Sequence, residues 1–192
     1  MKNIRKLFLS IRFHVAGSVT CYLILATCWL SSCNHSESDK SVGSKRVFPE
    51  YHYALDSVIK STTGIIGGIE LGENKQAIPV IQVDKAVEKT ANHITFEQKI
   101  DSISKYSITY SIENDTITEI DVHITSSNAD FGDKIINDLK NYYRTKYTAP
   151  IMDKGFFVFN CFDSKKQNFI ITLTDNSSNS NSAIDMSVYR EK

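Results

Sequence analysis

Strict alternation of apolar and polar residues marks the middle of the chain. Alternate positions are apolar in three successive runs, and Glu113-Asn114-Asp115 supplies turn residues between the second and the third. This period of two predicts three half-buried β-strands. Their apolar residues are Ile94, Phe96 and Ile100 in 93–101, then Tyr106, Ile108, Tyr110 and Ile112, then Ile120, Val122 and Ile124.

The pattern changes to a helical period after the third run. Apolar residues then recur at i, i+4, i+8 and i+11 until Pro150, and Ser127 with Asp130 resembles a capping box at the start. This stripe predicts an amphipathic helix. Its members are Phe131, Ile135, Leu139, Tyr142 and Tyr143. Near-helical spacing over 48–60 predicts a second, shorter helix earlier in the chain.

Three further strands are predicted at Phe156 to Phe162, Asn168 to Thr174 and Ala183 to Tyr189. Both faces of the first of these strands are apolar. Two interpretations fit: the strand is central and covered on both sides, or one face offers aromatic side chains to a partner.

Two segments before the first strands are less regular. Four glycines crowd into residues 64–72, which predicts a bend. Residues 75–89 fit either a helix that begins at Pro79 or a strand, because Val80, Ile81 and Val83 favour strands. The resulting order is helix, three strands, helix, three strands. Consecutive antiparallel strands with helices on one face predict an α+β fold, a two-layer sandwich.

The N-terminus has the organisation of an export signal. Four basic residues, Lys2, Arg5, Lys6 and Arg12, precede an apolar run from Val15 to Leu30 and the small residues Ser31 and Ser32. The apolar run is about 24 Å long as a helix, shorter than the ~30 Å hydrocarbon core of a bilayer. We therefore expect residues 1–32 to be a signal peptide, followed by a tether at 33–46 and a single domain at 47–192.

The end of this segment, Leu30-Ser31-Ser32-Cys33, resembles the lipobox of bacterial lipoproteins. The resemblance implies cleavage between Ser32 and Cys33, a diacylglyceryl thioether on Cys33 and a further fatty acid, such as palmitate, on the new amino group. Several acyl chains would hold the protein permanently in the membrane. An uncleaved N-terminal helix and a secretory signal cut elsewhere are the alternatives.

Residues after the cysteine suggest the compartment. The polar segment 34–46 predicts a flexible tether. Glu37 and Asp39 are similar to the acidic export signal of Bacteroidetes surface lipoproteins, although a consecutive acidic run is missing. We expect anchorage in the outer membrane, on its periplasmic or its surface face.

Charge and cysteine content narrow the classes of partner. The chain has 22 basic and 22 acidic residues. Removal of the predicted signal peptide removes four basic residues and no acidic residue. The remaining 22 − 4 = 18 basic residues and 22 acidic residues give a net charge of −4. This excludes the basic field typical of nucleic-acid binding. Cys161 is the one cysteine after Cys33, and its apolar neighbours predict a small buried side chain.

Candidate catalytic chemistry is sparse. Glu119, Asp121 and His123 share one face of a predicted strand, where a metal could collect them, but alternating polar residues usually face water. His52 and His93 have no nucleophile motif beside them, and the glycine cluster lacks the Lys and Ser/Thr of a phosphate loop. We expect no catalytic site, no metal and no cofactor.

The Gly-Ile-x-x-Gly stretch at 68–72 ahead of a helical segment and strands resembles domains of the BamE and β-lactamase-inhibitory-protein type. That resemblance implies a binding module. We expect a lipid-anchored module that binds a protein or small ligand, an inhibitor or immunity protein being one form, with the membrane as partner through Cys33. A lipid-anchored hydrolase or metal-dependent enzyme using His123 or His93, and a structural component of outer-membrane assembly, are the alternatives.

Overall fold

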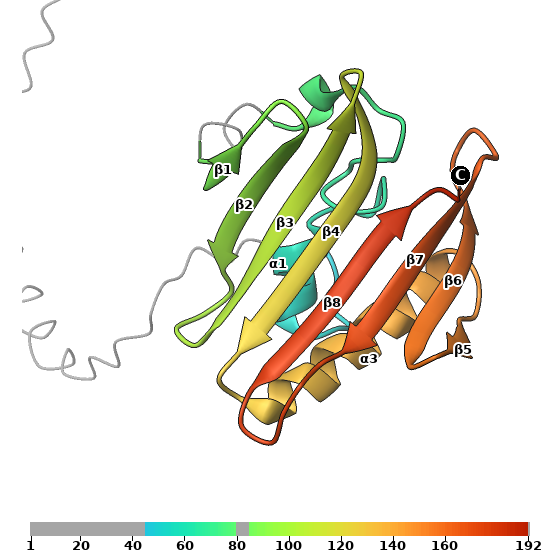
Figure 1. Cartoon of the computed structure of the whole chain (residues 1–192). Helices are drawn as coiled ribbons and strands as arrows, with labels where there is room; N and C mark the ends of the chain where they lie inside the picture. Colours follow the sequence, from blue (N-terminus) through green and yellow to red (C-terminus); the bar gives the residue numbers. More distant parts are fainter. Residues whose placement is uncertain (1–44, 80–84, 192) are drawn as a thin grey trace, which may run out of the picture. The chain divides into compact units, whose positions relative to one another are not determined.

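A computed structural model describes residues 45–79 and 85–191 of the chain. Residues 44–192 form one compact unit, built on an eight-stranded antiparallel sheet with the strand order β1-β2-β3-β4-β8-β7-β6-β5 (Figure 1). The strands are β1 Glu88–Lys89, β2 His93–Lys99, β3 Ser104–Glu113, β4 Thr116–Ser126, β5 Ile151–Asp153, β6 Phe156–Phe162, β7 Asn168–Asp175 and β8 Ser182–Tyr189. The helices are α1 Tyr53–Ile59, the 3-10 turn η1 Lys75–Ala77 and α3 Ala129–Lys146.

The sheet consists of two four-stranded meanders. β1 to β4 form one, β5 to β8 form the other, and α3 connects them in sequence. The pairing of β4 with β8 joins the two meanders at the centre of the sheet. The predicted α+β class and the antiparallel sheet are confirmed. The predicted count of three strands per block is wrong, because β1 and β5 have only two and three residues and are too short to show alternation.

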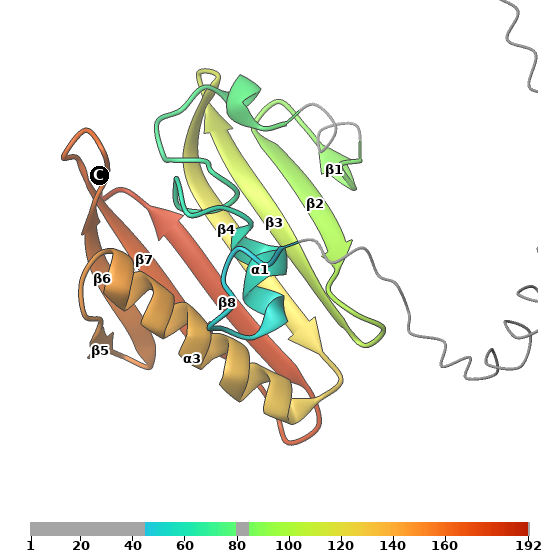
Figure 2. The same cartoon turned by 180° about the vertical axis from the view of Figure 1, so that it is seen from behind.

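Both helices lie on the same face of the sheet, as the reverse view shows (Figure 2). Successive strand residues point to opposite faces, so alternate side chains of each strand enter the core under the helices. Burial follows this rule closely: β3 and β8 alternate without exception between buried and less buried residues. The alternation of apolar and polar residues that predicted the strands is therefore the alternation of buried and less buried side chains in the structure.

Helix α3 follows the prediction with a shift at its start. The N-cap is Asn128, whose side chain accepts a hydrogen bond of 3.0 Å from the Asp130 amide, and Ser127 lies one residue earlier. The predicted apolar stripe is buried. Helix α1 is shorter than the predicted 48–60, because it begins only after His52, whose ring accepts from the Ala54 amide.

Turns fall where the sequence places them. Asn114 and Asp115 have φ values of 49° and 61°, the backbone of a type I′ turn, and they connect β3 to β4 directly. In the ambiguous segment 75–89, the structure shows η1 before Pro79 and β1 at its end. Residues 80–84, which include Val80, Ile81 and Val83, lie outside the described residues.

Within the described ranges, no helix is long and apolar enough to cross a membrane.

The glycine cluster is a tight bend that packs against the C-terminal end of α3. Gly64, Gly67, Gly68 and Gly72 all have positive φ. The Ile65 amide donates to the Ile69 carbonyl at 2.7 Å, which closes the bend. Lys146 of α3 holds it from outside, since its ammonium donates to the carbonyls of Thr62 and Gly64. The predicted bend is confirmed, and it fixes α1 against the end of α3.

Buried tyrosines make the core sensitive to alkali. Burial raises the pKa of Tyr142 from 10.0 to about 12, and it raises the pKa values of Tyr106, Tyr110, Tyr143 and Tyr147 as well. Between pH 10 and the raised values, the unfolded chain releases protons that the folded chain retains. Stability is therefore at its full value below pH 10 and falls as the pH rises above it.

We expect the free energy of unfolding to decrease between pH 10 and pH 12, with phenolate absorbance rising in the same transition that removes the far-ultraviolet circular dichroism. Lys60 and Lys146 work in the opposite direction, because burial lowers their pKa values, but two lysines are outnumbered by five tyrosines. Tyrosine ionisation near pH 10 in a chain that stays folded would contradict the prediction.

Candidate interaction surface

The face of the sheet opposite the helices is covered by no described helix or strand (Figure 1). The chemical character of its side chains changes across the strand order, from the β1 edge to the β5 edge. On β2, β3, β4, β8 and β7 the outward side chains are mainly hydroxyls and charged groups, whereas β5 and β6 expose apolar side chains. We call the first region the polar face and the second the β5–β6 strip, defined by Ile151, Phe156, Val158 and Phe162.

Two rows of polar side chains cross the polar face. Ser107, His123 and Asp185 are neighbours on β3, β4 and β8, and the His123 Nδ1 atom lies 2.5 Å from an Asp185 carboxylate oxygen. In the next row, the Ser187 hydroxyl donates to Asp121 at 2.5 Å. The side chains of these rows therefore bond mainly to one another across the strands.

The first row contains serine, histidine and aspartate in line, but it lacks the geometry of a nucleophile. Within the described residues, no hydrogen bond joins Ser107 to His123, and the small depression around them holds only 190 Å³. Asp185 has a second partner, the Asn176 amide at 2.6 Å. The row is a cross-strand network on a shallow surface.

The exposed His123–Asp185 pair contributes little to stability. Its side chains are 52% and 43% exposed, so water and salt screen the charges. Replacing Asp185 with Asn is expected to lower the free energy of unfolding by less than about 1 kcal/mol, measured by urea denaturation. A loss of several kcal/mol would show that the pair has a structural role that this exposure does not explain.

The candidate metal ligands do not converge. Asp121 and His123 point outward from β4 as expected, but each bonds to a different residue of β8. Over residues 45–79 and 85–191, no group of three or more His, Cys, Asp or Glu side chains is placed to hold a metal ion. Glu119 lies on the same face and makes interactions of its own.

The remaining candidate residues are scattered. His52 caps α1, and burial lowers the pKa of its ring. His93 bonds to Glu88 at 2.9 Å near the β1 edge. Cys161 is buried under α3, as predicted, and burial raises the pKa of its thiol to about 12, which suppresses the nucleophilic thiolate. Cys33 and Ser32 lie outside the described residues.

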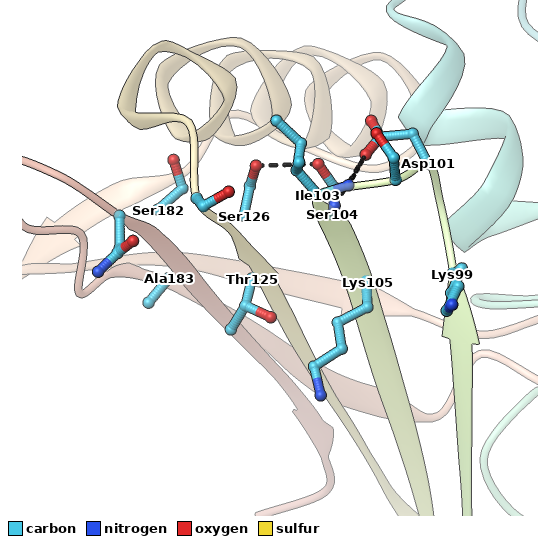
Figure 3. Close-up of a pocket in the computed structure, with 12 residues that line it drawn as sticks. Lys99, Asp101, Ile103, Ser104, Lys105, Thr125, Ser126, Ser182 and Ala183 are labelled. Carbon is cyan, nitrogen blue, oxygen red and sulfur yellow. Dashed lines mark hydrogen bonds between the residues drawn. The ribbon is translucent and has the colours of Figure 1, made fainter.

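Two larger hollows lie at opposite ends of the sheet. One of 470 Å³ lies where β2, β3, β4 and β8 meet the start of α3 (Figure 3). Three of its hydroxyls are engaged: Ser104 donates to Ser126 at 2.9 Å, while Ser182 donates to the Asn128 carbonyl and accepts from the Gly132 amide. The described residues that line it include no histidine, so they supply no imidazole base to activate these serines.

The other hollow, of 620 Å³, lies beside Arg190 and the glycine bend. The guanidinium of Arg190 is already held by Asp163 at 2.5 Å and by the Leu71 carbonyl at 3.0 Å. Its cation therefore fastens the end of β8 to the bend and to the β6–β7 turn. This role is structural.

The two interpretations of β6 are distinguished by its place in the sheet. β6 is the second strand from the edge, and its face with Phe156, Val158 and Phe162 is turned away from the helices. The interpretation as a central strand covered on both sides is wrong, because the helices cover only the other face of the sheet. The sequence of β6 alone does not show which elements lie over each of its faces. Three side chains of the strip are strongly exposed: Ile151 58%, Phe156 42% and Phe162 65%.

Comparison with known proteins assigns the chain to no family. No protein-family model, curated protein or solved structure matches the chain. The resemblance to the lipobox and the resemblance to BamE-type and inhibitory-protein domains stay predictions.

Proposed function

We propose that the chain is a cell-envelope lipoprotein, anchored in the outer membrane through acyl chains on Cys33, whose folded domain is a non-catalytic binding module. A specific form of the proposal is an inhibitor or immunity protein that neutralises a protein partner at the membrane. The lipobox-like Leu30-Ser31-Ser32-Cys33 and the polar segment after it support the anchor.

The observation that supports a binding role most directly is the extent of the polar face. Its five strands lie ~4.8 Å apart and have 7 to 11 residues, about nine on average, which gives roughly 24 Å by 30 Å, or about 700 Å². A stable protein interface covers about 800 Å² on each partner. A flat surface approaching this size with many hydroxyl donors and acceptors suits a protein partner better than a small molecule, for which an enclosed cavity is typical.

Mass spectrometry of the native protein tests the anchor. The expected product begins at Cys33 and carries both the thioether-linked diacylglyceryl group and an amide-linked fatty acid. A protein that retains Met1, or a processed N-terminus without any fatty acid, would overturn this part of the proposal.

Affinity purification from envelope extracts tests the binding role. The wild-type chain is expected to retain one stoichiometric protein, and Thr109→Arg or Ser187→Arg on the polar face is expected to release it. Asn137→Arg on the exposed side of α3 is the matched control and is expected to retain the partner. Stoichiometric metal that is lost on Asp121→Ala and His123→Ala would instead favour a metal-dependent enzyme.

A further inference from the structure

The β5–β6 strip exposes an apolar surface that the binding role of the polar face does not use. Ile151 lies directly opposite Val158 in the strand pairing, and Phe156 and Phe162 lie toward the two ends of the same face of β6. Three of the eight strongly exposed large hydrophobic side chains of the described residues, Ile151, Phe156 and Phe162, lie on this face. Met152 of β5, 62% exposed, pairs with Phe157 and points to the other face. Exposed apolar groups gathered in this way mark an interaction site.

Lysines flank both ends of the strip. Lys154 lies in the β5–β6 turn, where its φ of 49° and the φ of 89° at Gly155 make a tight reversal. Lys165 and Lys166 lie in the β6–β7 turn at the other end. β6 has seven residues, so the two groups of lysines are roughly 23 Å apart. The strip is a row of apolar side chains, interrupted by the exposed Asn160 on the same face, between two groups of cations.

The neighbouring acids cancel only part of this positive charge. Asp163 is buried and paired with Arg190. Glu70 accepts from the Ser164 hydroxyl, which does not neutralise a carboxylate, and Asp153 is exposed beside Phe156, so two acids remain against the three flanking lysines. Lys140 of α3 adds a further cation on the helix side of this edge, with its ammonium 4.3 Å from the centre of the Phe157 ring. This edge is basic although the chain beyond the leader carries a net charge of −4.

The combination of exposed apolar side chains and flanking lysines favours one class of binding partner over another. A second copy joined strip to strip would bring the lysines of both copies together, and like charges at close range oppose that contact. An anionic bilayer offers the opposite: phosphates for the lysines, and an interface that takes up Phe and Ile side chains. The acids Asp121 and Asp185 of the polar face lie on β4 and β8, two or more strands from β6.

We propose that the β5–β6 strip is a membrane-contact surface that binds anionic phospholipid headgroups independently of the acyl chains on Cys33. The contact places the β5–β6 end of the outward face against the bilayer, while the polar face begins at the neighbouring strand β7. It goes beyond the proposed binding role, and it holds or fails whether or not Cys33 is acylated.

The test uses residues 45–192 without a lipid. This fragment contains the whole core and is one compact unit, so it is expected to fold on its own. The single tryptophan of the chain, Trp29, lies outside it. Phe162→Trp therefore places a unique fluorophore in the strip. The probes are vesicles of phosphatidylcholine alone and vesicles in which about a quarter of the lipid is phosphatidylglycerol.

We expect the tryptophan emission of the Phe162→Trp fragment to shift to the blue with the anionic vesicles, and the fragment to co-sediment with them, more weakly as salt is raised. Phosphatidylcholine alone is expected to bind at least about tenfold more weakly. Combined Lys154→Glu, Lys165→Glu and Lys166→Glu substitutions are expected to weaken binding to the anionic vesicles by at least about tenfold. Ile151→Ser with Phe162→Ser is expected to weaken it similarly in sedimentation.

Matched controls exist at the opposite edge of the sheet. Lys85→Glu, Lys89→Glu and Lys99→Glu change the net charge equally, and Val87→Ser removes an apolar side chain that is 65% exposed. These variants are expected to bind as the unaltered fragment does. Absence of binding, or equal losses in the control variants, would overturn the proposal. Dimerisation that depends on concentration and is abolished by the strip variants would also overturn it, because the strip would then bind a second copy of the chain. A fragment that does not bind vesicles, and whose strip variants lose the purified protein partner, would overturn it as well.

Discussion

Gly64→Ala is expected to lower the free energy of unfolding by about 3 kcal/mol. Gly64 has a φ of 65°, a conformation that L side chains rarely adopt. A methyl group there would lie 2.5 Å from the carbonyl oxygen of Gly68, which is backbone and cannot rotate away. The bend would have to open, and the contacts of its carbonyls with Tyr143 and Lys146 would weaken. Urea denaturation followed by circular dichroism measures the loss.

Gly155→Ala is the matched control. Gly155 also has a positive φ, 89°, but no atom lies within 4 Å of its added methyl group. Only the conformational cost of about 1 kcal/mol then applies. Equal losses at the two positions would show that backbone conformation, and not the crowding against Gly68, decides the effect.

Asp163→Ala is expected to be as damaging, with a loss of about 3 to 4 kcal/mol. The Asp163 side chain is 1% exposed. One of its carboxylate oxygens accepts from Arg190 at 2.5 Å, and the other accepts from the amides of Lys165 and Gln167. Removing it leaves a partly buried guanidinium without its counter-charge, in addition to an Nε atom that already lacks a partner among the described residues.

Two further variants isolate the cause. Arg190→Met in the Asp163→Ala background is expected to recover part of the loss, since it removes the uncompensated charge. Glu97→Ala, which breaks the exposed pair with Lys105, is expected to cost less than about 1 kcal/mol. If Asp163→Ala and Glu97→Ala had equal effects, burial of the Asp163–Arg190 pair would not be its source of stability.

Local patterns predicted most of the elements. The bounds of β6 are those expected from Phe156 to Phe162, and β2, β7 and β8 differ from the predicted bounds by a residue or two at most. β4 is longer than its predicted apolar residues indicated, since it begins four residues before Ile120. Each of these strands has one face in the core, so burial imposes the period of two on its sequence. α3 is similarly visible because its apolar stripe covers the sheet.

Pairings between distant segments were not predictable. The hydrogen bond between His123 and Asp185 depends on the register of β4 against β8, and 62 residues separate the two side chains in sequence. The exposure of Phe162 depends on its face of the sheet being uncovered, which is decided by the placement of both helices on the other face. The lysines that flank the strip were visible as residues, but nothing local indicated that β6 would align them with exposed aromatic side chains.

The pairing of β4 with β8 has a consequence for biogenesis. β4 ends at Ser126, whereas its partner β8 begins only at Ser182, 56 residues later in the chain. While the chain is being synthesised, one long edge of β4 therefore lacks its neighbour until β8 has emerged. The two meanders join into one sheet only after that. During that interval the exposed edge needs protection from pairing with other nascent chains.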